Sequence, residues 1–303
     1  MSIHRDTIPF GPAKIVHGSD TFYSAGDIDV TVVTERADVN PDQYGQGVKT
    51  VIDQIIEVVF KPQSLWSLLD KVYPSAEIAP TIGSRSIGAS PTALIIHGED
   101  SSLLTIPCPA ITGMPSLMLG VDKGEFGTMK YTGIVTNGKN IGESGALYTY
   151  AATGGTYGTP ATPDYLAAAQ WDVTWKSTAL TGTLLESVTI NPELKIEAVK
   201  AGPRTMDFRR RGIQFTADII DAADLTALSG IINDAATFKF GGRNTADGGD
   251  LVLTSVLGHT FTMVTAALDK AAMKYAMKQA RPRALSFRTA ALTGARVSWT
   301  TPA

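Results

Sequence analysis

A single cysteine, Cys108, occurs among the 303 residues, so no internal disulfide bond can form. Cys108 lies between two prolines in an apolar stretch, and we expect it to be a small buried side chain. A cysteine–histidine catalytic pair would need an exposed, activated thiol instead. One cysteine and four dispersed histidines also cannot build a zinc cluster. We therefore expect no metal site and no cofactor.

Long hydrophobic runs are missing as well. No apolar segment reaches the length of about 18 residues that a membrane span requires. The segment from Met1 to Phe10 contains His4, Arg5 and Asp6 and lacks the apolar core of a signal peptide. We expect no contact with a membrane and synthesis in a reducing cytoplasm.

Common catalytic motifs are absent too. The sequence has no Walker loop for phosphate, no nucleophile elbow of the form Gly-x-Ser-x-Gly and no His-Glu-x-x-His pair. Two glycine-rich stretches, 154–158 and 241–249, lack the spacing and the flanking strand and helix of a dinucleotide-binding turn. We interpret both stretches as flexible loops. No catalytic residue is assigned, and we expect the protein not to be an enzyme.

Charge is scarce and unevenly distributed. Charged residues make up 18% of the chain, and the net charge of −3 argues against a general nucleic-acid coat. Residues 1–158 hold 10 Lys and Arg against 16 Asp and Glu, whereas residues 159–303 hold 16 against 13. An acidic half and a basic half can meet head to tail between copies of the chain. Chance variation between the two halves is the alternative.

Short alternating segments are abundant, and they predict a mainly β protein. In the interval 50–60, Ile56, Val58 and Phe60 fall on one face, together with Ile52, and Glu57 falls on the other with Asp53. Further strands are predicted in the first half at 28–33, 93–96, 103–111, 116–121 and 128–135.

One segment follows helical spacing instead. Its apolar positions lie on one helical face, Ser64 is a candidate N-cap and Pro74 ends the helix. The face comprises Leu65, Trp66, Leu68, Leu69, Val72 and Tyr73. We expect Trp66, and Trp171 further along the chain, to pack in the core.

The second half repeats this order at a near-constant spacing. A strand is predicted at 171–175, and the segments at 188–190, 213–217 and 284–292 correspond to those at 30–32, 56–60 and 128–136. A second helix is expected around Leu225 to Ile232, capped by Asp221 or Asp224. The Ala-, Met- and Lys-rich stretch 266–279 has helical propensity, but it aligns with the strand at 116–121 and alternates, so we predict a strand.

This order predicts two tandem copies of one fold. We assign residues 1–141 to the first copy, residues 142–163 to a linker and residues 164–303 to the second copy. The linker is rich in Gly, Thr, Tyr and Ala and shows no clear period.

Two polar segments, 36–49 and 195–211, are predicted to be long loops that follow the second strand of each copy. Both contain charges of either sign, which suits contacts between subunits or between rings; an ordinary mobile loop is the alternative. Arg209 to Arg211 forms the densest basic run, for which we favour an interface over a solvated face, with DNA binding third. The candidate interface residues are Arg36, Asp38, Asp42, Lys49, Lys195, Glu197, Arg204, Asp207, Arg209, Arg210 and Arg211.

Several phrases resemble the tail tube proteins, or major tail proteins, of long non-contractile-tailed bacteriophages. They follow one another in the same order across residues 10–138, and the second half is matched through the internal repeat. The phrases are Gly11 to Val16, Phe22 to Ile28, Val58 to Pro62 followed by Trp66 and Tyr73-Pro74, Ala93 to His97, Gly113 to Leu117 and Gly127 to Thr132.

The resemblance implies a fold and a role. Each copy is expected to be a β-sandwich or barrel flanked by one α-helix, and the subunits are expected to stack as rings into a hollow tube that conducts DNA. In this family six copies of the fold usually close a ring, so a chain with two copies would close one with three chains. The expected location is the virion tail, assembled in the host bacterial cytoplasm.

Partners follow from the same resemblance. The chain is expected to bind itself and to contact tape measure, tail terminator and distal tail proteins, with DNA passing through the lumen without specific binding. Residues lining the lumen should be small, neutral or acidic, because clustered Lys and Arg would hold phosphate. Candidates for this lining are Thr31, Asp53, Glu57 and Thr189.

Two other functions remain open from the sequence. One is a different virion component with the same fold, such as a capsid decoration or baseplate protein. The other is a β-rich carbohydrate-binding or hydrolytic module, which would need exposed aromatics and paired carboxylates on one face.

Overall fold

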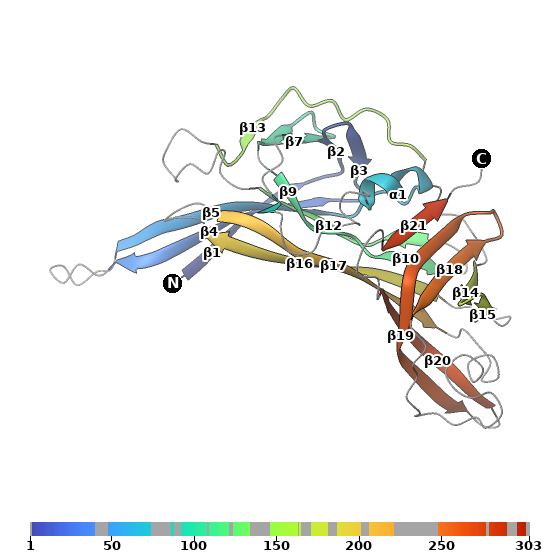
Figure 1. Ribbon diagram of the computed structural model, residues 1–303. Coiled ribbons are helices and arrows are strands. Elements are labelled where there is room, and N and C mark those ends of the chain that lie inside the picture. The colour runs from blue at the N-terminus through green and yellow to red at the C-terminus, as the bar shows by residue number, and fades with distance from the viewer. Residues whose placement is uncertain are drawn as a thin grey trace.

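The computed structural model describes residues 2–39, 48–73, 86–87, 92–107, 109–120, 124–133, 146–162, 164, 171–180, 187–200, 206–220, 248–276, 279–289 and 296–300. Within these ranges the protein is mainly β, as predicted, and its strands form three antiparallel sheets (Figure 1).

The first sheet has five strands and contains a long hairpin. Its order is β1 (Ser2–Phe10), β4 (Ile28–Val39), β5 (Val48–Phe60), β12 (Met129–Gly133) and β9 (Pro109–Gly113).

A smaller five-stranded sheet lies over one side of the first. Its order is β13 (Thr149–Ala151), β8 (Leu103–Ile106), β7 (Leu94–Gly98), β2 (Ala13–His17) and β3 (Asp20–Tyr23).

The third sheet has eleven strands and contains a second long hairpin. Its order is β11 (Gly124–Phe126), β10 (Leu117–Gly120), β16 (Ser187–Lys200), β17 (Met206–Ile220), β20 (Gln279–Thr289), β19 (Thr260–Ala276), β18 (Gly249–Ser255), β14 (Trp171–Trp175) and β15 (Thr178–Ala179). Two short strands lie off this path, β21 (Val297–Thr300) on β19 and β6 (Ser86–Ile87) on β17.

Several of these strands coincide with segments in which apolar and polar residues alternate. Ile56, Val58 and Phe60 of β5 are buried, whereas Glu57 between them is only partly buried, so the predicted face is confirmed for residues 56–60. The stretch 266–276 is extended, in agreement with the strand prediction and against its helical propensity. The predicted strand at 103–111 is split into β8 and β9 by the segment that contains Pro107, because proline has no N–H for a ladder.

The predicted first helix is present but short. It consists of a 3₁₀ turn η1 (Trp66–Leu68) and one turn of α-helix α1 (Leu69–Val72). Ser64 does not cap it, which corrects that prediction: residue Leu65 occupies the cap position, and the Ser64 hydroxyl instead accepts a hydrogen bond from Phe126 N at 3.4 Å. The second predicted helix, around 225–232, lies outside the described residues.

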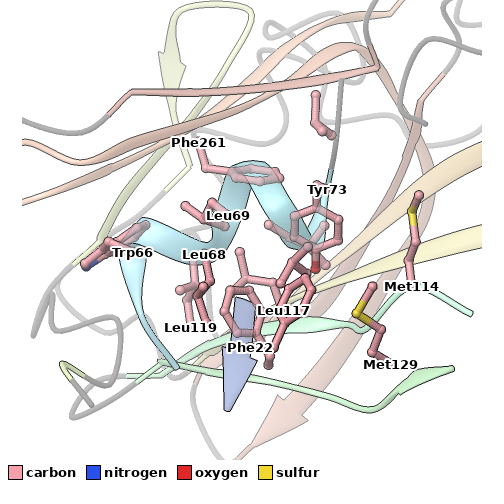
Figure 2. Packing of buried hydrophobic residues seen from close by; sticks show 14 of the residues in the cluster. Phe22, Trp66, Leu68, Leu69, Tyr73, Met114, Leu117, Leu119, Met129 and Phe261 are labelled. Carbon is pink, nitrogen blue, oxygen red and sulfur yellow. The ribbon is translucent and has the colours of Figure 1, made fainter. Parts of the chain in front are cut away.

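This helix packs between the two halves of the chain. Leu68 and Leu69 lie among Leu117 and Leu119 of β10 and Phe261 of β19 (Figure 2). The Trp66 indole stacks on His259 with ring centroids 4.0 Å apart, and the ring centroid of Trp171 lies 5.6 Å from that of Trp66. Both tryptophans are buried, as predicted.

Strand pairing follows the same order twice along the chain. The order β4–β5–β12–β9 recurs as β16–β17–β20–β19, and β3–β2–β7–β8 recurs as β15–β14–β18–β19. Opposed residues match as well: Val30 faces Val58, which faces Tyr131, just as Ile190 faces Ala217, which faces Phe287.

Two β-bulges fall at matching places in the two sets of strands. In β9, Thr112 is the extra residue between the pairs Ile111–Tyr131 and Gly113–Lys130; in β19, Asp269 is the extra residue between Leu268–Phe287 and Lys270–Ser286. The long hairpins likewise leave Ile52 extra in β5 and Arg211 extra in β17. A bulge is a specific local irregularity, so its recurrence at matching positions is unusual for unrelated sheets.

The described part of the predicted linker lies against the small sheet. β13 pairs with β8, and Gly155 N donates to Ser101 O at 2.8 Å. A Cβ atom at Gly155 would overlap the Ser102 carbonyl oxygen, so this glycine serves a close backbone approach. Residues 154–158 form a loop, as predicted, and Gly155 attaches this loop to the small sheet, whereas 241–247 lie outside the described residues.

Candidate assembly interface

The two segments predicted to be long polar loops are largely strand, which corrects that prediction. β4 continues to Val39 and β5 begins at Val48; β16 continues to Lys200 and β17 begins at Met206. Charged and apolar residues alternate in both segments, and this period of two suits a hairpin arm as well as it suits a polar loop. Both hairpins extend toward the left of Figure 1.

In the first hairpin, candidate interface residues oppose one another across the ladder. Asp38 is the partner of Lys49, and Arg36 is the partner of Val51 beside the bulge at Ile52. A cross-strand pair of opposite charge adds modestly to the stability of a hairpin. Asp42 and Cys108 lie outside the described residues.

In the second hairpin the same arrangement occurs. Glu197 is the partner of Arg209, Arg210 is the partner of Ile196, and Arg211 is the bulged residue. The partner of Lys195 is Gly212, and that of Asp207 is Val199. Arg204 lies outside the described residues.

Matching of the two hairpins changes one sequence inference. The near-constant spacing of the two halves in the sequence places the basic run opposite about Ile52 to Gln54, a stretch that carries the oppositely charged Asp53. The matching bulges instead align Arg210 with Val51 and Arg211 with Ile52, and Asp53 corresponds to Gly212. A contrast of charge at corresponding positions therefore does not support an interface there.

Three of the candidate lumen residues lie on the face that points away from the core. Thr31 is the ladder partner of Glu57, and both are partly buried between the fully buried positions of their strands. Thr189 alternates with buried Val188 and Ile190 in β16 in the same way. Asp53 is the ladder partner of Glu35.

Two basic side chains on this outer face are paired with carboxylates. Lys130 Nζ lies 2.7 Å from Glu57 Oε1, and Arg288 lies 3.6 Å from Asp269. Asp269 is the bulged residue of β19; at the matching bulge in β9, Thr112 shares a 2.7 Å hydrogen bond with Thr132 instead. Sequence reasoning named Glu57 but missed Lys130, Asp269 and Arg288, and only the bulge register brings Asp269 beside Arg288.

Several strands have edges without a ladder partner among the described residues, and three long ones bear on assembly. β1 pairs with β4 alone, β16 beyond Ile190 pairs with β17 alone, and β19 beyond Ala266 pairs with β20 alone. Such edges present rows of N–H and C=O groups that can pair with another chain.

One junction inside the chain already joins the two sets of strands. β10 is hydrogen bonded to β16, with Leu117 opposite Ile190. β9, which precedes β10, lies along the next part of β16 with Cα atoms within 8 Å, although no ladder joins them. The last edge of the first set of strands thus pairs with β16, the first strand of the second set.

Chemically reactive groups are sparse in the described parts of the chain. No group of three or more His, Cys, Asp or Glu there could hold a metal ion. Burial lowers the pKa of His17 and His259, and Asp20 and Asp164, respectively, offset this only in part. Burial and the nearby Lys14 also lower the pKa of His97, whose Nδ1 accepts a hydrogen bond from Thr156 N at 3.0 Å.

One cavity of about 360 Å³ opens beside β3 and β5. Lys61 and Glu125 form an ion pair of 2.6 Å at it, and Gln63 and Ser64 line it. Among the residues that line it, Glu125 alone carries a carboxylate, whereas glycoside hydrolysis uses a pair of them.

Over the described residues, no helix is long and apolar enough to cross a membrane. Comparison of the sequence with protein-family models and with curated proteins found no match.

Proposed function

We propose that this chain is a tail tube subunit of a long non-contractile phage tail, formed by two tandem copies of one fold. The recurring strand order and the two matching bulges support the tandem copies. The proposed role rests on the resemblance stated for residues 10–138 together with the features below.

The junction between β9–β10 and β16 is the observation that carries the proposal. It joins the last edge of the first set to the first edge of the second, so it is a head-to-tail contact. A head-to-tail contact that is repeated between chains generates a closed ring when its rotation closes. Three chains would then supply six copies of the fold around the ring.

The polar face that carries Thr31, Glu57 and Thr189 would line the lumen. Its basic groups Lys130 and Arg288 are held by carboxylates, which lowers the attraction that free cations exert on phosphate. DNA could therefore move past this surface during ejection without being gripped.

Electron microscopy of the purified protein over a range of concentrations, with mass measured in parallel, tests this proposal. Hollow rings or tubes with three chains per ring would support both the role and the tandem copies. Six chains per ring would keep the role and contradict two copies per chain. A compact dimer without a central hole would contradict the tube and favour a decoration protein, the main alternative.

A further inference from the structure

The N-terminal strand β1 covers one edge of the first hairpin along most of its length. Ser2 to Phe10 pair with Arg36 to Ile28 of β4, residue by residue. The corresponding edge in the second set belongs to β16, and there β10 of the first set pairs with Ser187 to Ile190, the counterparts of Asp27 to Val30. At Ile28 to Val30, β1 thus occupies on β4 the place that the preceding copy of the fold occupies on β16.

At the other end of the chain, the strand edge that corresponds to β10 has no second ladder partner among the described strands. In the first set, β10 is bonded both to β11 and to β16. In the second set, the distal part of β19, from Ala267 to Ala276, has β20 as its only ladder partner among the described strands. Pairing of this edge with the first hairpin of another copy would extend both sheets without displacing any of the described strands of the second set.

Matching the two sets gives the register of that contact. Leu117 faces both Phe126 and Ile190, and Met273 faces Pro282, the counterpart of Phe126. Since Val30 is the counterpart of Ile190, Met273 of one copy comes opposite Val30 of the next.

The neighbouring positions are complementary. In the same register Lys274 comes opposite Asp29 and Tyr275 opposite Ile28, which gives one pair of opposite charge between two apolar pairs.

β1 imitates this donor strand at the same three positions. Ile8, Pro9 and Phe10 are the partners of Val30, Asp29 and Ile28 in the single chain. Apolar residues thus stand where Met273 and Tyr275 would stand. Pro9 replaces Lys274, however, and proline can neither donate a ladder hydrogen bond nor pair with a carboxylate.

We propose that β1 is a displaceable cover over the β4 edge, and that the distal part of β19 from a second copy replaces it when the ring closes. The inference rests on the proposed ring and adds which edges meet, in which register and what must leave first. The cover keeps a long strand edge satisfied in the free subunit, and the missing N–H and charge at Pro9 make it the weaker of the two partners.

A disulfide lock tests whether β1 has to leave. Thr7 and Thr31 are directly opposed, so Thr7→Cys with Thr31→Cys in a Cys108→Ser background ties β1 to β4. The matched control is Ile95→Cys with Thr105→Cys, which locks the opposed strands β7 and β8 away from this edge. A third variant lacks residues 2–10. Ring formation is followed by native mass and electron microscopy, with and without reductant.

We expect the locked protein to remain a monomer when oxidised and to form rings when reduced, while the control forms rings in both states. Deletion of residues 2–10 should lower the concentration at which rings appear. Rings formed equally well by the oxidised lock would overturn the displacement of β1 and leave the tube proposal standing. Absence of rings from every form, the Cys108→Ser parent included, would contradict the tube itself.

A charge exchange tests the partner and the register. Asp29→Lys and Lys274→Asp should each raise the concentration needed for rings, by roughly threefold to tenfold per junction. The double variant should bring it back toward that of the unmodified chain. Single variants that assemble normally, or a double variant as impaired as both singles together, would overturn the assignment of β19 as the replacing strand.

Discussion

At the scale of single residues, the hydroxyl group of Tyr73 is a polar group in the core with a defined hydrogen bond. The Tyr73 hydroxyl is buried and donates a 2.7 Å hydrogen bond to Pro115 O, and burial raises its pKa far above the ordinary value. This bond fastens α1 to the segment between β9 and β10, which leads into the junction with the second set of strands.

Tyr73→Phe should lower the free energy of unfolding by about 1–2 kcal/mol, because it leaves the Pro115 carbonyl without this donor in a buried place. Urea unfolding monitored by tryptophan fluorescence measures the change. Tyr150→Phe is the control, since Tyr150 is 54% exposed and should be neutral. Equal effects of the two substitutions would contradict the argument.

His17 should make stability depend on pH in a defined direction. Burial lowers its pKa in the folded protein, its Nε2 has no hydrogen-bond partner among the described residues, and its ring meets the Tyr131 ring edge-on at 5.5 Å. The unfolded chain therefore binds a proton more readily, so stability is complete above about pH 6.5 and falls as the pH drops below it. Compared by urea unfolding at pH 7.5 and 5, His17→Gln should lose less stability than the unmodified chain; identical losses would refute the assignment.

At the scale of elements, the strands with clear alternation could be predicted from sequence, and several others could not. Residues 56–60 of β5, β14 and the proximal part of β16 have apolar residues at every second position, and these positions are buried. β1, β2, β3, β18 and β21 were not predicted. β3 has only four residues, so its alternation gives a weak signal.

The candidate site shows the same limit. The charged segments 36–49 and 195–211 were located correctly along the sequence. They were assigned to loops, because charge alternation alone does not distinguish a hairpin from a polar loop. The pair Thr112–Thr132 at one bulge corresponds to the pair Asp269–Arg288 at the other. Each pair depends on its bulge, because a shift of one residue in register moves every side chain to the other face.

The 146–162 segment gives a prediction at this scale. Gly155→Ala should release the segment from the small sheet, because the added methyl group would overlap the Ser102 carbonyl oxygen. Hydrogen exchange at Gly155 N and limited proteolysis of 146–162 should both accelerate. Gly26→Ala is a fair comparison, since no atom lies within 4 Å of its Cβ position. Unchanged protection in Gly155→Ala would show that the close approach is not required.

At the scale of the whole molecule, the charge on the outer face matters most for the proposed conduit. Asp269 and Arg288 are 57% and 45% exposed, so their ion pair adds little to stability. In the proposed tube, its effect would instead be to occupy an arginine that every ring would otherwise present to the lumen.

Asp269→Thr should therefore create a DNA-binding surface without unfolding the protein. We expect assembled rings of this variant to bind short duplex DNA at about 50 mM salt and to release it as salt rises. Fluorescence anisotropy measures this, and Asp269→Thr with Arg288→Thr, which restores the threonine pair of the other bulge, should bind no more than the unmodified rings. DNA binding that is the same in all three would contradict the role of the pair.

The junction between β10 and β16 has a consequence for how a ring would nucleate. Because one junction in every two lies within a covalent chain, half of the contacts of a ring form at the effective concentration of a tethered pair rather than by collision. Closure of a ring of six copies of the fold would then require only three chains to meet. The same tether imposes parity: a closed ring of this chain holds an even number of units, so rings of five or seven, which single-copy subunits could form by error, are unavailable to it.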